Sequence, residues 1–216
     1  MKSLYFFIAF IILLSGNYTP GKTIEPSIYQ GYQPREGDIL FQKLPDGKLA
    51  NAINGVTKSD YTHCGMVIKD TNGKWMVVEA YNRVIKVTLK SWIERGVNKG
   101  FAVCRLKECF NSIIPALVDS AKAMLRLPYD YKFSFDDEHI YCSELIYKAF
   151  MRVTGDTLGE TQKLETLNWQ AYEDFIRRTQ KGELPLDHEL ITPLAIAQAE
   201  QLTCIYERSL NKNNDN

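Results

Sequence analysis

The chain has 216 residues, of which 45% are hydrophobic and 24% are charged, so it has the composition of one globular domain rather than a disordered segment. The 26 Lys and Arg residues balance the 26 Asp and Glu residues, and the formal net charge is zero. A neutral chain offers no basic surface for nucleic acid or for anionic membranes. We therefore expect no nucleic-acid partner, and membrane contact only through the N-terminal segment.

The N-terminal segment is typical of an export signal. Lys2 supplies a positive charge, and an unbroken apolar run follows at residues 4–14. This run is shorter than the ~20 residues of a membrane-spanning helix, which favours a signal peptide over an anchor. We expect a signal at residues 1–21, with no motif that fixes the cleavage point, and a periplasmic or extracellular protein. An uncleaved membrane anchor is the alternative.

Apolar runs bounded by turn residues predict strands in the first half of a single domain, which we place at residues 37–210. The expected strands are 39–42, 61–69, 74–80, 84–89 and 101–106. Short helices are expected near residues 50–56 and around Trp92. Helical periodicity then predicts helices at 112–126, 141–153 and 169–179, with an irregular loop at 129–140.

The hairpin at residues 61–80 decides which side chains share a face. A three-residue loop ending at Gly73 would place that glycine in the left-handed conformation and set Glu79 opposite Gly65. Because side chains alternate along a strand, His63 and Glu79 would then share one face. A two-residue loop would shift the register by one residue and put them on opposite faces.

Cys142 has the surroundings expected of a reactive thiol. It lies at the start of a predicted helix, where unpaired N–H groups favour a thiolate and can bind an oxyanion. A base must take its proton, and a third group must orient that base. Of the three histidines, His63 is predicted beside the carboxylate of Glu79, whereas His139 and His188 lie in polar stretches. Each residue alone has an ordinary explanation: Cys142 as a buried cysteine, His63 as a core histidine and Glu79 as a surface carboxylate. The prediction therefore rests on their combination.

The cysteine count is five, so at least one thiol stays unpaired in a monomer. If Cys142 is free, the other four permit three disulfide pairings, and the sequence does not choose among them. Four buried, inert thiols are the alternative that we favour. The spacing of Cys and His residues predicts no metal site. The other four cysteines are Cys64, Cys104, Cys109 and Cys204.

Five blocks of sequence, in this order, resemble the permuted papain-like amidases of the YaeF/YiiX type, which belong with the NlpC-like cysteine peptidases and the lecithin retinol acyltransferase group. The blocks are GDILF (37–41), SDYTHCGMV (59–67), VEA (78–80), PYDYKF (128–133) and YCSEL (141–145). TPLA (192–195) resembles a late Ser/Thr-Pro segment of that family. The ordered set is far more specific than any one block.

The resemblance implies an α+β, circularly permuted papain-like fold, with an antiparallel, barrel-like sheet and flanking helices. It implies Cys142 as nucleophile, His63 as base and Glu79 as the orienting group, with the base preceding the nucleophile in the chain. The helix of Cys142 should point its N-terminus at the hairpin of His63 and Glu79.

Three further residues are expected to line the substrate's approach, namely Tyr141, Tyr61 and Asp60. Cys64 departs from the family pattern, and we expect it on the opposite strand face as an inert core residue.

The sequence thus predicts an exported cysteine hydrolase that cleaves an amide through a thioester on Cys142, with His63 as general base and no metal or cofactor. An amide-containing small molecule, a peptide or an acylated molecule is the expected substrate class. A lipid-directed acyltransferase or thioesterase, and a non-catalytic module that binds peptide or lipid, are the alternatives. The acyl acceptor and the oligomeric state stay open.

Overall fold

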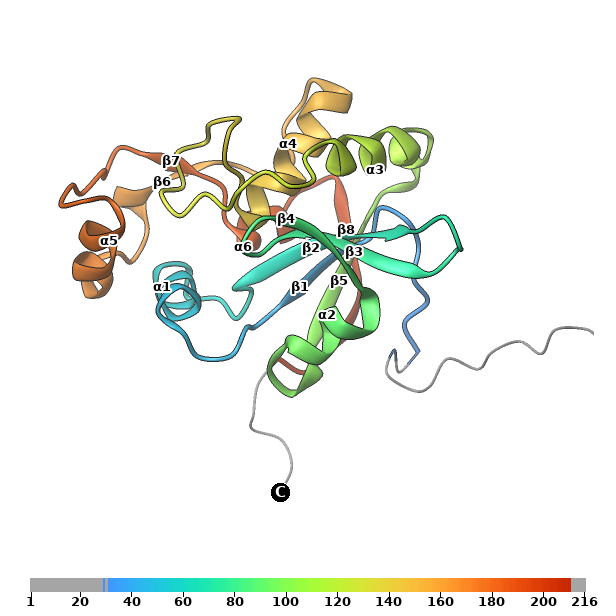
Figure 1. Cartoon of the computed structure of the whole chain (residues 1–216), viewed down its shortest axis with the longest axis horizontal. Coiled ribbons are helices and arrows are strands. Elements are labelled where there is room, and N and C mark those ends of the chain that lie inside the picture. Colours follow the sequence, from blue (N-terminus) through green and yellow to red (C-terminus); the bar gives the residue numbers. More distant parts are fainter. Residues whose placement is uncertain (1–28, 30, 211–216) are drawn as a thin grey trace, which may run out of the picture.

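The computed structural model describes residue 29 and residues 31–210, so the expected signal at residues 1–21 lies outside the described residues. The described chain forms an antiparallel sheet covered by helices on both faces (Figure 1). Within it, no helix combines the length and the apolar character needed to cross a membrane.

The main sheet has six strands in the order β4-β3-β2-β1-β5-β8. Its strands are β1 (Ile39–Gln42), β2 (His63–Lys69), β3 (Trp75–Ala80), β4 (Val84–Thr88), β5 (Phe101–Leu106) and β8 (Leu202–Arg208). A second sheet pairs β6 (Gln162–Lys163) with β7 (Glu189–Leu190). The first five strands of the large sheet match the expected ones within two residues at each end, whereas β8 and the small sheet were not predicted.

The helices are α1 (Lys48–Thr57), α2 (Leu89–Arg95), α3 (Ile114–Ala123), α4 (Cys142–Thr154), α5 (Glu173–Thr179) and α6 (Pro193–Ala197). Short 3₁₀ segments lie at Val97–Lys99, Glu108–Ile113, Leu164–Thr166 and Gln170–Tyr172. The helices expected at 112–126 and 169–179 are therefore each split into a 3₁₀ turn and a shorter α-helix. α4 ends where predicted, at Gly155, which adopts φ 74° and donates its N–H to the Met151 carbonyl at 2.8 Å.

Two apolar layers hold the sheet between helices, which explains why its central strands are continuous apolar runs. Ile39 and Phe41 of β1 belong to the buried cluster that includes side chains of α3 and α4. Leu40, between them, belongs to the cluster on the other face, where Trp92 and Ile93 of α2 are fully buried. Burying one such side chain contributes about 1.5–3 kcal/mol, so both helix layers fix the register of β1.

The sheet is antiparallel, as expected, but it remains open rather than closing into a barrel. Strands β4 and β8 form its two edges and do not pair with each other. The outer edge of β4 instead meets the segment after α3, because Val84 N–H donates to the Leu127 carbonyl at 2.8 Å and Arg126 N–H donates to the Val84 carbonyl at 2.9 Å. This segment covers the edge that barrel closure would require.

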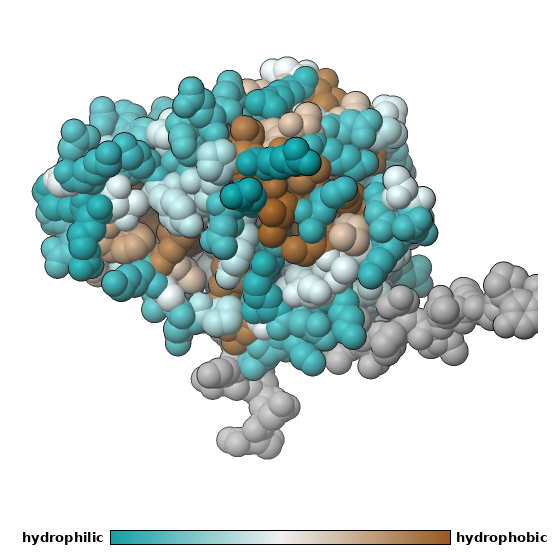
Figure 2. Space-filling model, viewed as in Figure 1, coloured by the Kyte–Doolittle hydropathy of each residue, from teal (hydrophilic) through white to brown (hydrophobic). Residues whose placement is uncertain are grey.

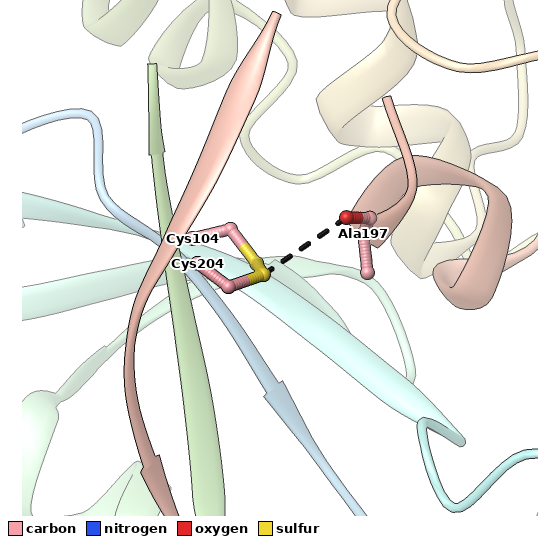
Figure 3. Close-up of a disulfide and its surroundings, with 3 residues drawn as sticks. All are labelled: Cys104, Ala197 and Cys204. Carbon is pink, nitrogen blue, oxygen red and sulfur yellow. Dashed lines mark hydrogen bonds between the residues drawn. A yellow bond between two sulfur atoms is a disulfide. The ribbon is translucent and has the colours of Figure 1, made fainter. Parts of the chain in front are cut away.

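A disulfide joins Cys104 of β5 to Cys204 of β8, two residues that lie directly opposite each other in the sheet (Figure 3). Cys204 Sγ also lies 4.0 Å from the Ala197 carbonyl oxygen of α6. Among the described residues the free cysteines are Cys64 and Cys142, which are buried, and Cys109, which is exposed. The prediction of four buried, unpaired thiols was therefore wrong, because the unpredicted strand β8 brings Cys204 against Cys104.

Candidate active site

The β2–β3 hairpin has the three-residue loop that places His63 and Glu79 on one face. Gly73 adopts φ 77°, and Asp70 N–H donates to the Lys74 carbonyl at 3.0 Å. Met66 pairs with Val78, so the preceding residue, Gly65, lies opposite Glu79. A Cβ at Gly65 would lie 3.3 Å from Glu79 Cβ and only 2.6 Å from a Val77 methyl group. Glycine at position 65 thus lets the two strands approach closely beside the candidate site.

His63 and Glu79 form a buried pair on that face. His63 Nε2 lies 2.5 Å from Glu79 Oε2, and the two residues are 2% and 0% exposed. Arg95, at the end of α2, donates a hydrogen bond from Nη2 to the same Oε2. Trp92 of α2 stacks on the imidazole with ring centroids 6.2 Å apart, and Tyr81 meets it edge-on at 5.9 Å. The ring is therefore held in one orientation by groups on all these sides.

In the His63–Glu79 pair, hydrogen bonds and opposite charges shift the pKa values more than burial does. Burial alone would raise the pKa of Glu79, but the hydrogen bonds and charges of His63 and Arg95 lower it below its ordinary value. Burial likewise would lower the pKa of His63, but its hydrogen bonds to Cys142 and Glu79, together with their charges, raise it to about 9. The arrangement favours an ionised carboxylate beside an imidazolium.

Cys142 is the first residue of α4, as predicted, and it is 2% exposed. The interaction of its thiol with His63 raises the pKa of His63 and lowers that of Cys142. Because Nε2 of His63 is engaged by Glu79, Nδ1 is the ring nitrogen that remains for the sulfur. Hydrogen bonds from Cys64 and His63 and the charge of His63 outweigh burial and hold the pKa of Cys142 well below the usual thiol value. Both pKa shifts favour a thiolate beside an imidazolium.

Cys64 also contacts the candidate nucleophile, which the sequence did not predict. It is fully buried and belongs to the cluster beneath α4, so it lies on the strand face opposite His63, as expected. Hydrogen bonding by its side chain and backbone nevertheless contributes to the lowered pKa of Cys142. Cys142 therefore interacts with both His63 and Cys64, the first two residues of β2.

The N-terminus of α4 is fixed by polar contacts of its neighbours. The Tyr141 N–H donates to Glu144 Oε2 at 3.2 Å, and Lys148 Nζ lies 2.9 Å from Glu144 Oε1. The Tyr141 hydroxyl accepts a hydrogen bond from the Ile191 N–H at 2.9 Å, and Ser143 donates to the Ile191 carbonyl at 2.8 Å. These contacts hold the turn that presents Cys142.

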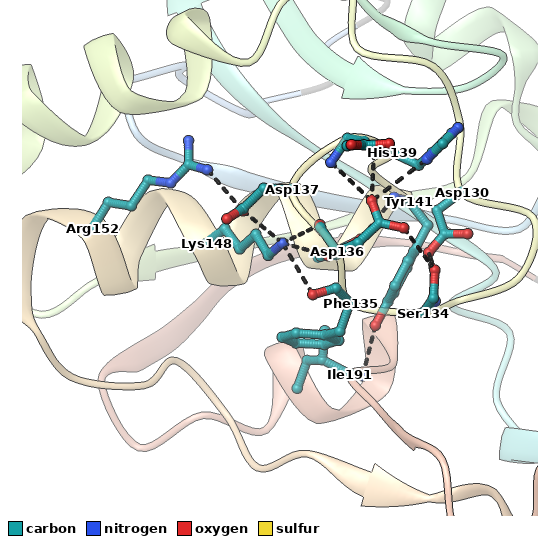
Figure 4. Close-up of polar contacts among 12 residues, drawn as sticks. Asp130, Ser134, Phe135, Asp136, Asp137, His139, Tyr141, Lys148, Arg152 and Ile191 are labelled. Atoms are coloured by element: carbon teal, nitrogen blue, oxygen red, sulfur yellow. Dashed lines mark hydrogen bonds and ion pairs between the residues drawn. The ribbon is translucent and has the colours of Figure 1, made fainter.

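The loop at residues 129–140 is irregular, as predicted, and is tied to α4 by cations (Figure 4). Lys148 Nζ binds Asp137 Oδ1 at 3.0 Å and contacts the backbone carbonyls of Phe135 and Asp136. Phe133 packs on Tyr141 with ring centroids 4.8 Å apart. The loop thereby packs the rings of Phe133 and Phe135 against Tyr141, the residue that precedes Cys142.

Two grooves open at the candidate site. One contains Cys142 and has a volume of about 780 Å³ including its open mouth. Apolar side chains of α1 and α5 line it, such as Val56 and Ile176, and Figure 2 shows apolar surface between α5 and the body of the molecule. The other, about 960 Å³ on the same measure, contains His63 and polar residues such as Asn82. We call them the Cys142 groove and the His63 groove.

The residues expected to line the substrate's approach are only partly brought to the site. Tyr141 lines the Cys142 groove, although its hydroxyl is engaged by Ile191. Tyr61 packs on the buried Phe41 ring at 5.1 Å, and Asp60 binds Lys43 at 2.7 Å. Neither Tyr61 nor Asp60 lines either groove.

Comparisons with known proteins agree with this geometry. A family model described as "Permuted papain-like amidase enzyme, YaeF/YiiX, C92 family" matches residues 33–206. A protein of Escherichia coli K12, described as the uncharacterized protein YiiX, is 34% identical over 178 residues, which are 81% of this chain and 87% of that protein. A crystal structure described as metalloprotein yiiX from Escherichia coli O157:H7 has a TM-score of 0.77 and 32% identity, covering 82% of this chain and 99% of that chain. The family match spans the whole candidate site.

The word metalloprotein in the description of that crystal structure prompts a test of the donor atoms here. Within residue 29 and residues 31–210, no three His, Cys, Asp or Glu side chains gather so that they could hold a metal ion. His63 and Cys142 direct their donor atoms at each other and at Glu79 and Cys64 instead. The described residues therefore offer no donor set that fits a resident metal.

Proposed function

Since the chain belongs to the family of permuted papain-like amidases, we propose that it is an exported cysteine hydrolase that cleaves an amide through a thioester on Cys142. The observation that carries this proposal is the buried His63–Glu79 pair, with 2.5 Å between His63 Nε2 and Glu79 Oε2, whose histidine lowers the pKa of a thiol at a helix N-terminus. A thiolate, a base and an orienting group in mutual contact are what nucleophilic catalysis requires.

The proposed reaction has two steps. The Cys142 thiolate attacks the amide carbonyl, and the oxyanion that forms is stabilised by the N–H groups at the start of α4. The His63 imidazolium gives its proton to the departing amine, which leaves a thioester. His63 then takes a proton from water, the hydroxide equivalent attacks the thioester, and the thiolate is released with the carboxylic acid.

Glu79 acts as the orienting group, since it holds His63 through Nε2 and leaves Nδ1 for the thiol. Arg95 is a positioning residue in this proposal, because it binds the same Glu79 oxygen and keeps the carboxylate ionised. Arg95 also lies over the Tyr81 ring, with its guanidinium carbon 4.3 Å from the ring centroid. Tyr81 in turn packs against His63.

Export is part of the proposal. The Cys104–Cys204 disulfide supports it, since disulfides persist mainly in oxidising compartments. The positively charged, apolar N-terminal sequence supports it independently. The compartment would be the periplasm or the extracellular space.

The two grooves indicate the kind of substrate. The Cys142 groove is apolar and suits the acyl side of the scissile bond, and the more polar His63 groove suits the leaving amine. An amide of an apolar acyl group therefore fits better than a wholly polar peptide. The same apolar groove favours the second candidate, a lipid-directed acyltransferase or thioesterase, which differs in the bond cleaved or in the acceptor.

The proposal is tested with acyl p-nitroanilides and p-nitrophenyl esters of increasing chain length, assayed with the wild type and with Cys142→Ala. We expect p-nitroaniline release from the anilides, a transient acyl adduct on Cys142 by intact mass, and neither in Cys142→Ala. Adding an amine or an alcohol separates the candidates, since a hydrolase yields mainly free acid and an acyltransferase yields acylated acceptor. Absence of any adduct with every compound would contradict the enzyme assignment and leave a binding module.

A further inference from the structure

Several apolar side chains of the Cys142 groove lie outside the core of the molecule. Val56 of α1 and Phe175 and Ile176 of α5 line this groove, and none of the three belongs to either of the two apolar clusters that hold the sheet. None of the seven residues of α5, which lies at one end of the molecule in Figure 1, is buried. An apolar occupant of the groove would therefore complete the burial of these side chains.

Hydrogen bonds tie the segment that contains α5 to two different walls of the groove. On the side of α1, Asn168 donates to the Val56 carbonyl oxygen from its N–H at 3.0 Å and from Nδ2 at 3.3 Å. On the side of the loop at residues 129–140, Gln180 Nε2 donates to the Lys132 carbonyl oxygen at 2.7 Å. Gln180 and Lys132 both line the groove, so its walls meet at this bond. The groove is therefore bridged there and is not an open trough.

The two walls joined by this bond are anchored to different degrees. Phe133, which follows Lys132 in the loop, packs on Tyr141 with ring centroids 4.8 Å apart, and Lys148 of α4 binds Asp137 Oδ1 at 3.0 Å. The loop is thus fastened to α4 on both sides of its centre, whereas α5 contributes no residue to the core. Loss of the bond between the walls should therefore displace α5 and widen the groove, with the loop staying in place.

We propose that Gln180 is a specificity-determining residue, whose bond to the Lys132 carbonyl narrows the groove so that it accepts an unbranched acyl chain and excludes a branched one. An unbranched chain is one methylene wide along its whole length, whereas a branched chain adds width that the bridged groove can take only by breaking this bond. The inference rests on the proposed function in one respect, namely that the acyl group transferred to Cys142 lies in this groove.

The experiment compares p-nitroanilides and p-nitrophenyl esters of octanoic acid and of 2-propylpentanoic acid, which have the same number of carbon atoms and differ in branching. The variants are Gln180→Ala and Gln180→Glu, of which the second keeps the size of the side chain but loses the Nε2 donor. Arg178→Ala is the matched control, since Arg178 is an exposed residue of α5 that lines neither groove. In a Cys142→Ala background, displacement of the fluorescent parinaric acid by the two free acids measures binding without turnover.

We expect the ratio of kcat/KM for the branched substrate to that for the linear one to rise about 2- to 10-fold in both Gln180 variants, the range that loss of one hydrogen bond corresponds to. The ratio should stay unchanged in Arg178→Ala, and the displacement by the two acids should shift in the same way.

An unchanged ratio in both Gln180 variants, with normal turnover of the linear substrate, would overturn the inference and leave the proposed function standing. Absence of turnover in every protein would instead contradict the proposed function. In that case equal displacement by the linear and the branched acid, with Gln180 intact, would overturn the inference as well.

Discussion

At the level of single residues, the candidate site depends on one carboxylate oxygen that binds two cations. Glu79 Oε2 accepts from both His63 and Arg95, and the carboxylate is fully buried. A buried carboxylate without such partners would take up a proton rather than remain charged. Arg95 therefore offsets part of the negative charge that Glu79 presents to His63. The pKa of His63 reports how strongly Glu79 stabilises the imidazolium in the presence of Arg95.

Replacing Arg95 with Met should raise the pKa of His63 above its value of about 9, because a nearby positive charge is removed and Glu79 Oε2 binds His63 alone. The imidazolium would then persist to higher pH. An NMR titration of the His63 ring measures this directly, with Arg95→Lys as the matched control that keeps the charge. Unchanged titration in Arg95→Met would mean that Arg95 serves only packing.

The residues around His63 also show what sequence could and could not predict. His63, Glu79 and Cys142 were predicted from a helix start, from a hairpin register left open between two loops, and from the family resemblance. The structure has the three-residue loop that sets His63 and Glu79 on one face and starts α4 at Cys142. Arg95 and Cys64 were not assigned roles, since their contacts depend on how α2 and α4 dock onto the sheet. No local pattern encodes that docking.

At the level of secondary-structure elements, close approach of β2 and β3 holds the site together. Gly65→Ala would place a Cβ 2.6 Å from a Val77 methyl group and 3.0 Å from the Val78 carbonyl oxygen. We expect a loss of about 1–3 kcal/mol in the free energy of unfolding and slower alkylation of Cys142, because Glu79 is displaced from His63.

Gly73→Ala is the control for this substitution. Gly73 has φ 77° and no atom within 4 Å of its added Cβ, so the variant should lose stability through backbone strain without moving Glu79. Chemical denaturation and alkylation rates measure the two effects separately. Equal alkylation rates in both variants would contradict the claim that Gly65 positions the pair.

The disulfide should stabilise the edge of the sheet. The double variant Cys104→Ser, Cys204→Ser should lose about 2–4 kcal/mol in the free energy of unfolding, since the bond closes a long loop in the unfolded chain and ties β8 to β5. Denaturant titration of both proteins, and of the wild type under reducing conditions, measures the loss. A stability equal to that of the wild type would show that pairing of β8 alone suffices.

Strand β8 illustrates why part of the fold escaped prediction. Its central residues 203–207 are exposed or only half-buried, so they form no apolar run bounded by turn residues of the kind that identified β1 to β5. The strand is held by pairing with β5 and by the disulfide, both contacts over long sequence separations. The same missing strand explains why the cysteine pairing was not predicted.

At the level of the whole molecule, the site lies where the Cys142 groove and the His63 groove meet. Leu49, Ile53 and Tyr131 line both grooves.

If the apolar groove receives the acyl chain, Val56→Trp should abolish turnover of long-chain substrates and leave short-chain ones largely unaffected. Asn82→Trp, in the His63 groove, is the matched variant and should change the preference for the leaving group instead. Identical chain-length profiles for wild type and Val56→Trp would contradict this assignment.

The central claim is that Cys142 and His63 form a thiolate–imidazolium pair, and the alkylation rate of Cys142 against pH tests it most directly. Peptide mass spectrometry locates the modified thiol in the wild type, in His63→Ala and in His63→Gln. We predict that the wild-type thiol reacts well below the ordinary thiol pKa of about 8.5 and that both variants lose this reactivity, because the pKa of Cys142 is held down by His63 and Cys64. A Cys142 that titrates like an ordinary thiol, or whose alkylation does not depend on His63, would contradict the account.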